Sequence, residues 1–359
     1  MLDIKNDANI RKFIDSIYDN KEQSNKLKLI LESKIDNSFN NIKQVLLIGE
    51  MKFKSISSIV DKLLYADPTK LSYKVSYKDG KIDKINIFDD ENNFYIKSED
   101  AKNTVALIRS GYKNQLISYL CKQLKEIGVL VINDPECVSI SNDKYLTALN
   151  LEKYSISQPK FVLVESDDIH KGDSKKLDEK LKKIYKESND DTKYVCKLLG
   201  GHGGKGVFLC RKSNITSVLQ CIFAIDKECK ILVQEKLDIK DGDIRAHVIT
   251  IKGKQKIIDV TLREKGSNDF RTNLSLGNHQ KENYKLTPEQ ETIVKETAKA
   301  SGLIWCGVDL LQNDSNKNYV IEYNGAPGPP SDMTTDQEEL LKNNEEFYLK
   351  LLNTIDDLL

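Results

Sequence analysis

Two apolar strand-like runs, GVDLL at 307–311 and YVIEYN at 319–324, flank the polar segment NDSNKN at 313–318. A turn-rich polar segment between two apolar runs predicts an antiparallel hairpin. If the hairpin is symmetric about that segment, Asp309 lies opposite Glu322 and Gly307 lies opposite Asn324. The second half of the chain carries further strand and helix patterns, so it is predicted to form an antiparallel sheet with flanking helices.

The predicted hairpin places acidic side chains against each other. Like charges directly opposed on a sheet repel, and Glu322 and Asn324 share one face because strand side chains alternate. Three oxygen-bearing side chains, those of Asp309, Glu322 and Asn324, therefore converge on one patch, and a hard divalent cation would remove the repulsion. A solvated hairpin face is the alternative, which the apolar neighbours on both strands disfavour.

A glycine-rich loop, GGHGGKG at 200–206, holds five of the chain's 18 glycines between the strand patterns YVCKLL and VFLC. Such a loop brings backbone N–H groups close to a ligand, and phosphate oxygens are the usual ligand. The loop matches neither the Walker pattern nor GxGxxG before a helix. A flexible hairpin turn is the alternative, although a turn needs fewer glycines.

A lysine and three arginines are candidate anion-binding residues. Lys197 lies in the apolar run YVCKLL, where an ammonium group is costly unless it meets an anion; a lysine that snorkels to water from an edge strand is the alternative. Arg245, Arg263 and Arg271 lie on or near the hairpin predicted at 244–263, and guanidinium groups suit carboxylate and phosphoryl oxygens. Each arginine taken alone is better explained by a surface ion pair.

Charge and cysteine content limit the classes of partner. The chain has 55 basic and 55 acidic residues, so no net field favours nucleic acid or an anionic membrane. The seven cysteines form no CxxC pair and mostly lie in apolar runs, which indicates reduced thiols and a cytoplasmic protein. No apolar stretch reaches the length that spans a bilayer, and the four histidines give no metal-ligand spacing or hydrolase triad.

The first 135 residues or so are predicted to form an α/β domain. A buried strand at 44–50 and a hairpin at 74–88 with Asp79-Gly80 at its turn precede a strand, helix and strand between 105 and 133. Two strands joined by a helix within about 30 residues indicate a parallel βαβ unit.

Seven motifs, taken in order, resemble the ATP-grasp superfamily, and most closely the RimK-type ligases that add glutamate to protein or peptide C-termini. The resemblance covers about residues 100 to 330. The motifs are DKYLTALNL, YVCKLLGGHGGKGV, ILVQEKL, DIRAHVI, LREKGSNDFRTNLSLGN, GVDLL and VIEYNGAPG. The first hundred residues do not resemble the family clearly, and NGAPGPP stands where RimK-like members usually have Asn-x-Ser-Pro-Gly.

The resemblance implies an ATP-grasp fold, α/β plus α+β, with a preceding α/β domain, and it implies roles for specific residues. Asp309, Glu322 and Asn324 match magnesium ligands, with two ions expected and manganese as an alternative metal. In the expected reaction Arg263 and Arg271 would stabilise the oxyanion and the departing phosphoryl group, and Arg245 is a third catalytic candidate. The implied nucleotide contacts are Lys144, Lys197, Gly203, Gly204, Gln234, Glu235, Lys236, Leu237, Asp243, Arg271, Thr272 and Asn273, with the adenine at the segment 234–237.

The domain boundaries expected from these patterns divide the chain into four parts. They are an N-terminal helical extension at 1–40, a pre-ATP-grasp domain at 41–137, a small lid subdomain at 138–232 and a large subdomain with the metal site at 233–359. ATP would lie between the last two parts, with the glycine loop as a lid.

The expected activity is that of an ADP-forming carboxylate–amine ligase working through an acyl phosphate, with an amino acid such as glutamate and a peptide or protein acceptor as substrates. Neither nucleic acid nor membrane is an expected partner, and a homo-oligomer stays open. Two other functions also stay open: an ATP-grasp kinase for a small molecule, and a synapsin-like protein that binds ATP without catalysis. Amine-dependent release of ADP would separate the three.

Overall fold

The computed structural model describes most of the chain and groups it into two compact units. One unit contains residues 1–134 together with residues 334–359, and the other contains residues 135–333. The described residues are 39–49, 62–110, 112–169, 174–199, 206–264, 280–281, 284–329 and 337–359.

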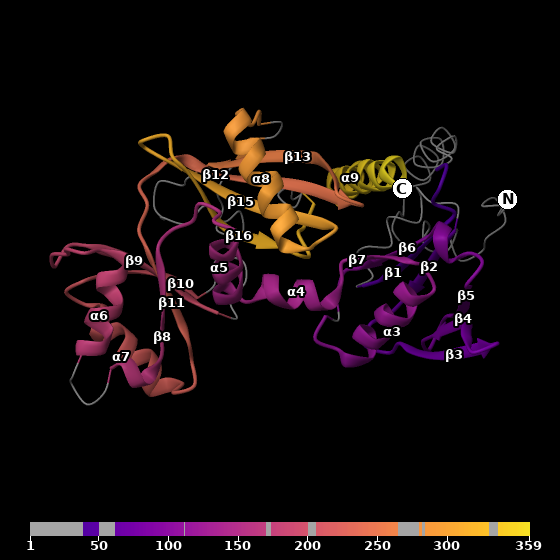
Figure 1. Ribbon diagram of the computed structural model, residues 1–359, viewed down its shortest axis with the longest axis horizontal. Coiled ribbons are helices and arrows are strands. Elements are labelled where there is room, and N and C mark those ends of the chain that lie inside the picture. Colours follow the sequence, from indigo (N-terminus) through magenta and orange to yellow (C-terminus); the bar gives the residue numbers. More distant parts are fainter. Residues whose placement is uncertain are drawn as a thin grey trace. The chain divides into compact units, whose positions relative to one another are not determined.

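A four-stranded parallel sheet forms the first layer of the N-terminal unit (Figure 1). Its strands, in the order β2-β1-β6-β7, are β2 Leu63–Ala66, β1 Gln44–Ile48, β6 Thr104–Ile108 and β7 Leu130–Ile132. Helix α3, Gln115–Glu126, connects β6 to β7, and those two strands are parallel. The predicted βαβ unit is therefore confirmed.

Helix α3 forms where its sequence combines a cap with a one-sided apolar pattern. The Asn114 side chain accepts the Leu116 N–H at 2.9 Å, which satisfies a backbone donor at the helix start. Ile117, Leu120 and Leu124 recur at helical spacing and are fully buried. These side chains belong to the core cluster that also holds strands of both sheets of this unit.

The second sheet of this unit is a three-stranded meander of β3 Ser72–Lys78, β4 Lys81–Phe88 and β5 Asn93–Lys97. Asp79 and Gly80 have φ of 53° and 74°, so the β3–β4 turn has the conformation that favours a two-residue hairpin. The hairpin predicted around Asp79-Gly80 is confirmed.

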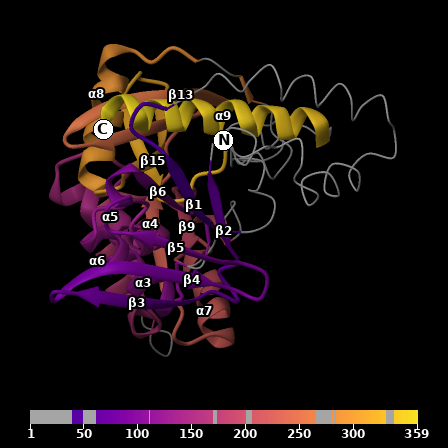
Figure 2. The ribbon, with the colours of Figure 1, turned by 90° about the vertical axis from the view of Figure 1, so that its right-hand side faces the viewer.

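A single carboxylate ties the C-terminal helix to the start of the described chain. Helix α9, Gln337–Leu358, is one continuous helix (Figure 2). Near its end, Asp356 accepts the backbone N–H groups of Asn40, Asn41 and Ile42 at 2.7 to 2.8 Å. The contacts thus group α9 with the N-terminal unit, whereas the sequence suggested that it belongs to the large subdomain; the four-part division stays a prediction.

The other unit contains a four-stranded antiparallel sheet with two helices on it. Its strands, in the order β10-β9-β11-β8, are β10 Val207–Arg211, β9 Lys193–Leu198, β11 Ile231–Glu235 and β8 Phe161–Val164. Helices α6, Lys175–Ile184, and α7, Ile215–Ile225, contribute Leu177, Leu181 and Leu219 to its core. Short 3-10 turns lie at Ser166–Asp168 and, in the other unit, at Ala101–Asn103.

The largest sheet of this unit has five antiparallel strands. In the order β14-β13-β12-β15-β16 they are β14 Gln280–Lys281, β13 Lys254–Glu264, β12 Ile239–Ile251, β15 Trp305–Asn313 and β16 Asn318–Asn324. Helix α8, Pro288–Ser301, lies across β12, β15 and β16 (Figure 1). Two further helices, α4 Pro135–Asn142 and α5 Lys144–Lys153, contact β16.

The ends of α8 follow from its sequence. Thr287 and Gln290 form a reciprocal capping box, and Gly302 ends the helix in the left-handed conformation with φ of 68°. On its inner side the Gln290 amide donates to the Asn318 side chain at 3.1 Å, which links α8 to β16.

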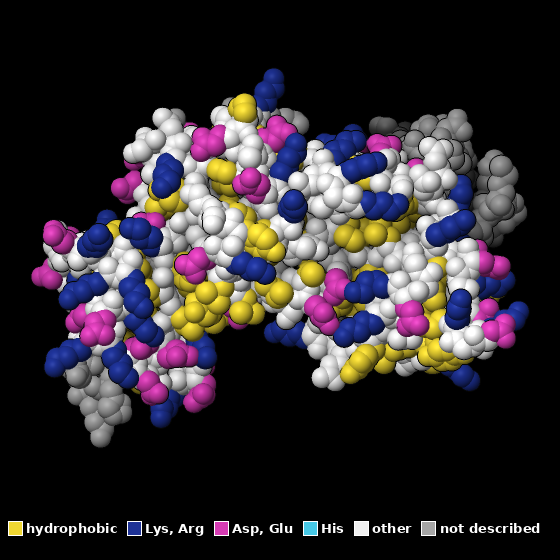
Figure 3. Space-filling view, in the orientation of Figure 1, with side chains coloured by type: hydrophobic (Ala, Val, Ile, Leu, Met, Phe, Trp, Pro, Cys, Tyr) yellow, Lys and Arg dark blue, Asp and Glu magenta, His cyan; other side chains and the backbone are white. Residues whose placement is uncertain are grey.

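Two sequence-based expectations concern the state of the cysteines and the presence of a membrane-spanning segment. All seven cysteines are free thiols, of which Cys121, Cys196, Cys210 and Cys306 are buried and Cys221 is exposed. Within the described residues, no helix is long and apolar enough to cross a membrane. On the face drawn in Figure 3, basic and acidic side chains are interspersed, in keeping with the zero formal net charge.

Candidate functional site

The β15–β16 hairpin has the predicted pairing at its site end. Asp309 lies opposite Glu322, and Gly307 lies opposite Asn324. Towards the turn the pairing is one residue away from the prediction, because Leu310 pairs with Val320 instead of Ile321. A bulge next to Asp309 absorbs the extra residue, so the assumed symmetry fails near the turn while the acidic pair is kept.

Charged side chains from four neighbouring strands share one face of the five-stranded sheet. Directly opposed residues of antiparallel strands point to the same side, and Arg245 of β12 lies opposite Asp309. Two residues away on β12, Asp243 lies opposite Arg263 of β13. The register therefore places five charged side chains on one side of the sheet, those of Asp243, Arg245, Arg263, Asp309 and Glu322. This side includes residues that the sequence analysis assigned to magnesium and phosphate binding.

Asp309 is the most tightly held of these groups. It is 1% exposed, and both of its oxygens accept from Arg245, the Nη2 contact being 2.7 Å. Arg263 Nη2 lies 2.9 Å from Asp309 Oδ2. Burial alone would raise the pKa of Asp309, but the two guanidinium groups and their hydrogen bonds outweigh it and hold that pKa well below its usual range.

Arg263 joins Asp309 to a second carboxylate. Its Nη2 forms an ion pair with Asp243 Oδ2, and its Nε donates to Asp243 Oδ1 at 3.2 Å. Burial opposes the charge on Arg263, yet Asp309 and Asp243 raise the pKa of its guanidinium above the ordinary value. Arg263 therefore stays charged, and both arginines contact the metal-ligand candidate Asp309.

Lys197 and Lys144 approach the same carboxylates from other elements. Lys197 lies on β9 and Lys144 is the first residue of α5, whose N-cap is Asp143. Burial lowers the pKa of both lysines, and the negative charge of Glu322 opposes that shift in each case. Lys144 also lowers the pKa of Lys197, so the two ammonium groups and Glu322 are electrostatic neighbours.

The pKa of Glu322 is raised, whereas the pKa values of the two lysines are lowered. Burial raises its pKa most, the facing Asp309 raises it further, and Lys197 and Arg245 oppose the rise. Glu322 is partly exposed and, among the described residues, has no basic group within ion-pair distance. Of the two opposed carboxylates, Glu322 is therefore the one whose charge is less compensated by basic groups.

The strand assigned to the adenine carries polar backbone contacts. Gln234 is buried, and Glu235 Oε1 accepts the Lys160 N–H at 2.8 Å. The Lys236 N–H donates to the hydroxyl of Tyr185 at 3.0 Å, and the Tyr185 ring meets Tyr194 edge to face at 5.4 Å. Leu237 follows β11, and its carbonyl accepts from the Lys236 ammonium group.

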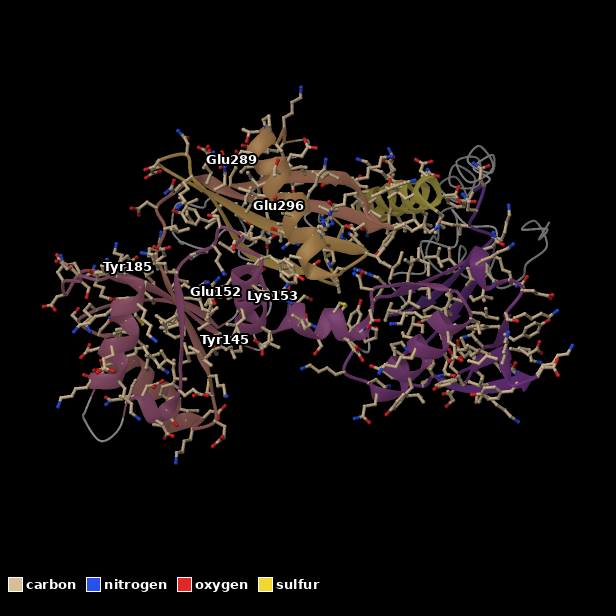
Figure 4. All side chains as sticks on the ribbon, viewed as in Figure 1. Tyr145, Glu152, Lys153, Tyr185, Glu289 and Glu296 are labelled. Atoms are coloured by element: carbon tan, nitrogen blue, oxygen red, sulfur yellow. The ribbon has the colours of Figure 1, made fainter. Side chains whose placement is uncertain are left out.

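The sequence analysis did not identify Tyr185 as a candidate site residue. It follows α6 directly and lies beside the sheet in Figure 4. Burial raises the pKa of its hydroxyl to about 12, so it is protonated at neutral pH. A lone aromatic residue at the end of the charged helix KKLDEKLKKI was the only available signal.

The segment after β16 fits closely against its surroundings. The Gly325 N–H donates to Ser141 Oγ at 3.0 Å. A Cβ on Gly307 would lie 2.8 Å from Cβ of Pro327, which shows that the NGAPG segment covers the strand position opposite Asn324. Asn324 therefore lies opposite Gly307, which the NGAPG segment covers, and two residues after Glu322 of the acidic pair.

Several predicted residues lie outside the described part of the chain. They are Gly203 and Gly204 of the glycine-rich loop, and Arg271, Thr272 and Asn273. Their assigned roles stay predictions. Among the described residues, the structure brings together Lys144, Lys197, Arg245, Arg263, Asp309 and Glu322.

The donor set suits magnesium. No group of three His, Cys, Asp or Glu side chains converges within the described ranges, but the predicted set consists of two carboxylates and one amide. Carboxylate and amide oxygens are ligands that hard divalent cations prefer. The opposed Asp309 and Glu322, with the pKa of Glu322 raised by burial and by its neighbour, are an arrangement that a cation would stabilise.

Comparison with known families and sequences gives a consistent result. Residues 141–339 match the RimK-like ATP-grasp domain. A probable alpha-L-glutamate ligase of Vibrio atlanticus (strain LGP32) is 31% identical over 209 residues, covering 58% of this chain and 63% of that protein. A protein of the same description from Maridesulfovibrio salexigens is 30% identical over 213 residues, with the same coverage. The match thus spans less than two thirds of the length of these relatives.

Solved structures share the fold over most of the chain. The ATP-grasp ligase PsnB complexed with minimal precursor has a TM-score of 0.57 and 13% identity, and the match covers 86% of this chain and 99% of that one. A RiPP-associated ATP-grasp ligase of Chryseobacterium gregarium gives 0.56 at 11% identity, covering 86% and 97%. D-alanyl-alanine synthetase A of Vibrio cholerae gives 0.53 at 13% identity, covering 88% and 99%. These likenesses show an ATP-grasp fold and confirm the predicted fold class.

Proposed function

Because the chain belongs to the RimK-like ATP-grasp domain family, we propose that it is an ATP-dependent carboxylate–amine ligase. One observation carries the proposal: the buried Asp309 lies opposite Glu322 and is held by Arg245 and Arg263, with Lys144 and Lys197 as electrostatic neighbours. Phosphoryl transfer needs positioning and neutralisation of charge, and this cluster supplies both.

The chain's own residues suggest a sequence of events. Lys197 and Lys144 bind the phosphates of ATP, whose negative charge opposes the lowering of both lysine pKa values by burial. Magnesium held by Asp309, Glu322 and Asn324 would neutralise charge on the β- and γ-phosphates. A substrate carboxylate attacks the γ-phosphorus and gives an acyl phosphate and ADP.

The second half of the reaction forms the amide. An amine attacks the acyl carbon, and phosphate leaves with the electron pair of the C–O bond. Arg245, held against Asp309 and more exposed than Arg263, is oriented to stabilise the charge that develops on the oxyanion and on the departing phosphate. No covalent intermediate on the enzyme is required.

We propose an amino acid, glutamate above all, and a peptide or protein as the two substrates. The names of the relatives support this choice, because the similar sequences are described as alpha-L-glutamate ligases and two similar structures hold precursor, leader or core peptides. Identity below 25% carries only the fold from those structures, so the acceptor rests on the family and on the sequence motifs.

Trapping the intermediate tests the proposal. With ATP, magnesium and a panel of amino acids and peptides, hydroxylamine in place of the amine should yield a hydroxamate and ADP. Oxygen-18 in the substrate carboxylate should appear in the released phosphate. Glu322→Gln should abolish both signals, whereas Glu289→Gln, an exposed change on α8 (Figure 4), should leave them intact.

The other outcomes identify the alternatives. A stable phosphorylated product without label in phosphate would indicate a kinase. Nucleotide binding without ADP release across the panel would indicate a binding protein. Formation of AMP and pyrophosphate would replace the acyl phosphate by an adenylate and refute the assigned chemistry.

A further inference from the structure

The three-stranded meander β3–β4–β5 (Figure 2) has one side in the core and the other in solvent. Ile85, Ile87 and Ile96 are fully buried in the cluster that also holds the apolar side of α3. Because strand side chains alternate, the residues next to these isoleucines point to the outer side of the sheet. Five lysines lie at such outer positions, and they are Lys74, Lys78, Lys81, Lys84 and Lys97.

Two pairs of these lysines lie directly opposite each other. Lys78 pairs with Lys81 beside the turn, and Lys84 of β4 pairs with Lys97 of β5. Like charges directly opposed on a sheet destabilise it. The stability of the meander therefore does not favour this arrangement, whereas an anionic partner bound across the strands would remove the repulsion.

The protein compensates these positive charges only in part. Lys97 Nζ lies 3.0 Å from Glu99 Oε1, and both side chains are well exposed. In the described part of the chain, the other four lysines have no carboxylate within ion-pair distance. Asp79 lies in the β3–β4 turn, and Asp83, at the bulge of β4, is the single acidic residue of the three strands. Five positive charges thus stand against three negative ones.

The opposite end of the meander is acidic. The β4–β5 turn contains Asp89, Asp90 and Glu91, and Lys70 Nζ pairs with Asp90 Oδ2 at 3.0 Å. A polyanion that ran the full length of the strands would meet these carboxylates. The lysines therefore suit a short acidic segment better than a long nucleic-acid strand, whose backbone carries a charge at every nucleotide.

The aromatic residues of the outer side also favour a peptide over nucleic acid. Tyr95 is 51% exposed, and Lys84 Nζ lies over its ring at 5.3 Å from the centroid. The other exposed ring on this side, Phe88, directly precedes the acidic turn. One aromatic ring therefore lies among the lysines, whereas sheets that bind single-stranded RNA stack two or three bases on their aromatic residues.

We propose that this lysine face, formed by Lys74, Lys78, Lys81, Lys84 and Lys97, binds an acidic segment of the peptide or protein acceptor, at a distance in sequence from the group that reacts. The inference rests on the proposed function for the identity of the partner. The opposed lysine pairs carry its acidic character. Carboxylates of the acceptor then take the place that no carboxylate of the described chain fills.

Fluorescence anisotropy with a labelled decaglutamate peptide tests the face without any turnover. Wild-type protein should bind the peptide at low salt with a dissociation constant on the order of 100 µM or below. The affinity should fall as salt rises, because exposed charges are screened. A Gly-Ser peptide of the same length should not bind. Absence of decaglutamate binding, or equal binding of the neutral peptide, overturns the proposal.

A triple variant tests the lysines themselves. The changes Lys74→Gln, Lys78→Gln and Lys81→Gln together should weaken decaglutamate binding about tenfold, in line with the loss of three exposed charge contacts. The melting temperature should stay equal or rise, because the repulsion between Lys78 and Lys81 is removed. Unchanged affinity for decaglutamate in this variant refutes the lysine face.

The matched control removes three exposed lysines from the other unit by the changes Lys254→Gln, Lys285→Gln and Lys299→Gln. It alters the net charge of the protein by the same amount. Its affinity for decaglutamate should equal that of wild type. Equal weakening by the two triple variants would indicate non-specific attraction and overturn the proposal.

An oligothymidylate of the same charge decides between the two kinds of polyanion. Wild-type protein should bind it more weakly than decaglutamate, because a single ring among the lysines offers little surface for stacking. If the oligothymidylate binds more tightly, and the triple variant of the face loses that binding, the surface recognises nucleic acid and the proposal is wrong.

An amide-forming assay separates this inference from the proposed function. For an acceptor peptide that carries an acidic segment, the triple variant of the face should raise KM several-fold with kcat unchanged, roughly the effect of losing exposed charge contacts. An acceptor without that segment should show no change. Absence of turnover with every substrate would contradict the ligase, while anisotropy still tests the face. Turnover with equal KM for both acceptors would leave the ligase standing and refute the acidic segment.

Discussion

The two sheets of residues 135–333 differ in whether ion pairs within the protein compensate the charged residues of the candidate site. In the five-stranded sheet, Asp243, Arg263, Asp309 and Arg245 satisfy one another within the protein. In the four-stranded sheet, Lys197 has no carboxylate within ion-pair distance among the described residues, and burial lowers the pKa of its ammonium group. A satisfied charge is held in place by folding, whereas an uncompensated one gains most when a ligand arrives.

The largest expected effect is at Asp309. Asp309→Ala should destabilise the protein by about 3 to 5 kcal/mol, because two guanidinium groups lose their buried partner. It should also remove detectable turnover. Urea unfolding and an ADP-release assay measure the two effects.

Asp168→Ala provides the comparison for stability. Its partner Lys180 is partly exposed, so water compensates that ammonium group and a smaller loss is expected. Equal stability of wild type and Asp309→Ala would remove the distinction between the two sheets.

Glu322→Gln should separate stability from activity. Turnover should fall by at least about a hundredfold, since the proposed magnesium site loses one of its ligands. The free energy of unfolding should stay the same or rise, because a negative charge directly opposite Asp309 is removed. Near wild-type turnover at saturating magnesium would exclude Glu322 from the metal site.

The ionisation of Glu322 should also affect how stability depends on pH. The pKa of Glu322 in the folded, metal-free protein is raised above the ordinary 4.5. Its contribution to stability is therefore present below the unfolded pKa and is lost as pH rises through the folded pKa. Glu322→Gln should match wild type at pH 4 or so and be relatively more stable at pH 7, as measured by unfolding in EDTA.

Lys197→Met tests the other sheet. ATP affinity should fall by about ten- to a hundredfold, in line with the loss of one charge-assisted contact, while the melting temperature stays equal or rises. Isothermal calorimetry and thermal unfolding measure these quantities. An ATP affinity equal to that of wild type would show that the lysine does not bind the phosphates.

The smallest expected effect is at Tyr185. Tyr185→Phe removes the acceptor for the Lys236 N–H at a cost of about 1 kcal/mol. The KM for ATP should rise several-fold with little change in kcat, because only the segment predicted to receive the adenine is affected. A lower kcat with an unchanged KM would place Tyr185 in the chemistry and not in nucleotide positioning.

Local patterns were sufficient for many elements. Asn114 and Thr287 mark helix starts, Gly302 marks a helix end and Asp79-Gly80 marks a hairpin, because the energies that select caps and turns act within a few residues. The bulge beside Asp309 could not be predicted from the hairpin sequence, because its position depends on the strand that pairs on the other side.

The sequence by itself determined the acidic pair Asp309 and Glu322, since strand alternation and one short turn are sufficient to oppose them. Only the tertiary structure decided that Arg263 forms ion pairs with both Asp243 and Asp309, because β12 had to lie between β13 and β15 before a guanidinium group from one could reach a carboxylate on the other. It likewise decided that Asp356 ties α9 to residues 40–42. Ion pairs between distant segments depend on which strands become neighbours, and that choice is made by burial of the whole core and not by any local pattern.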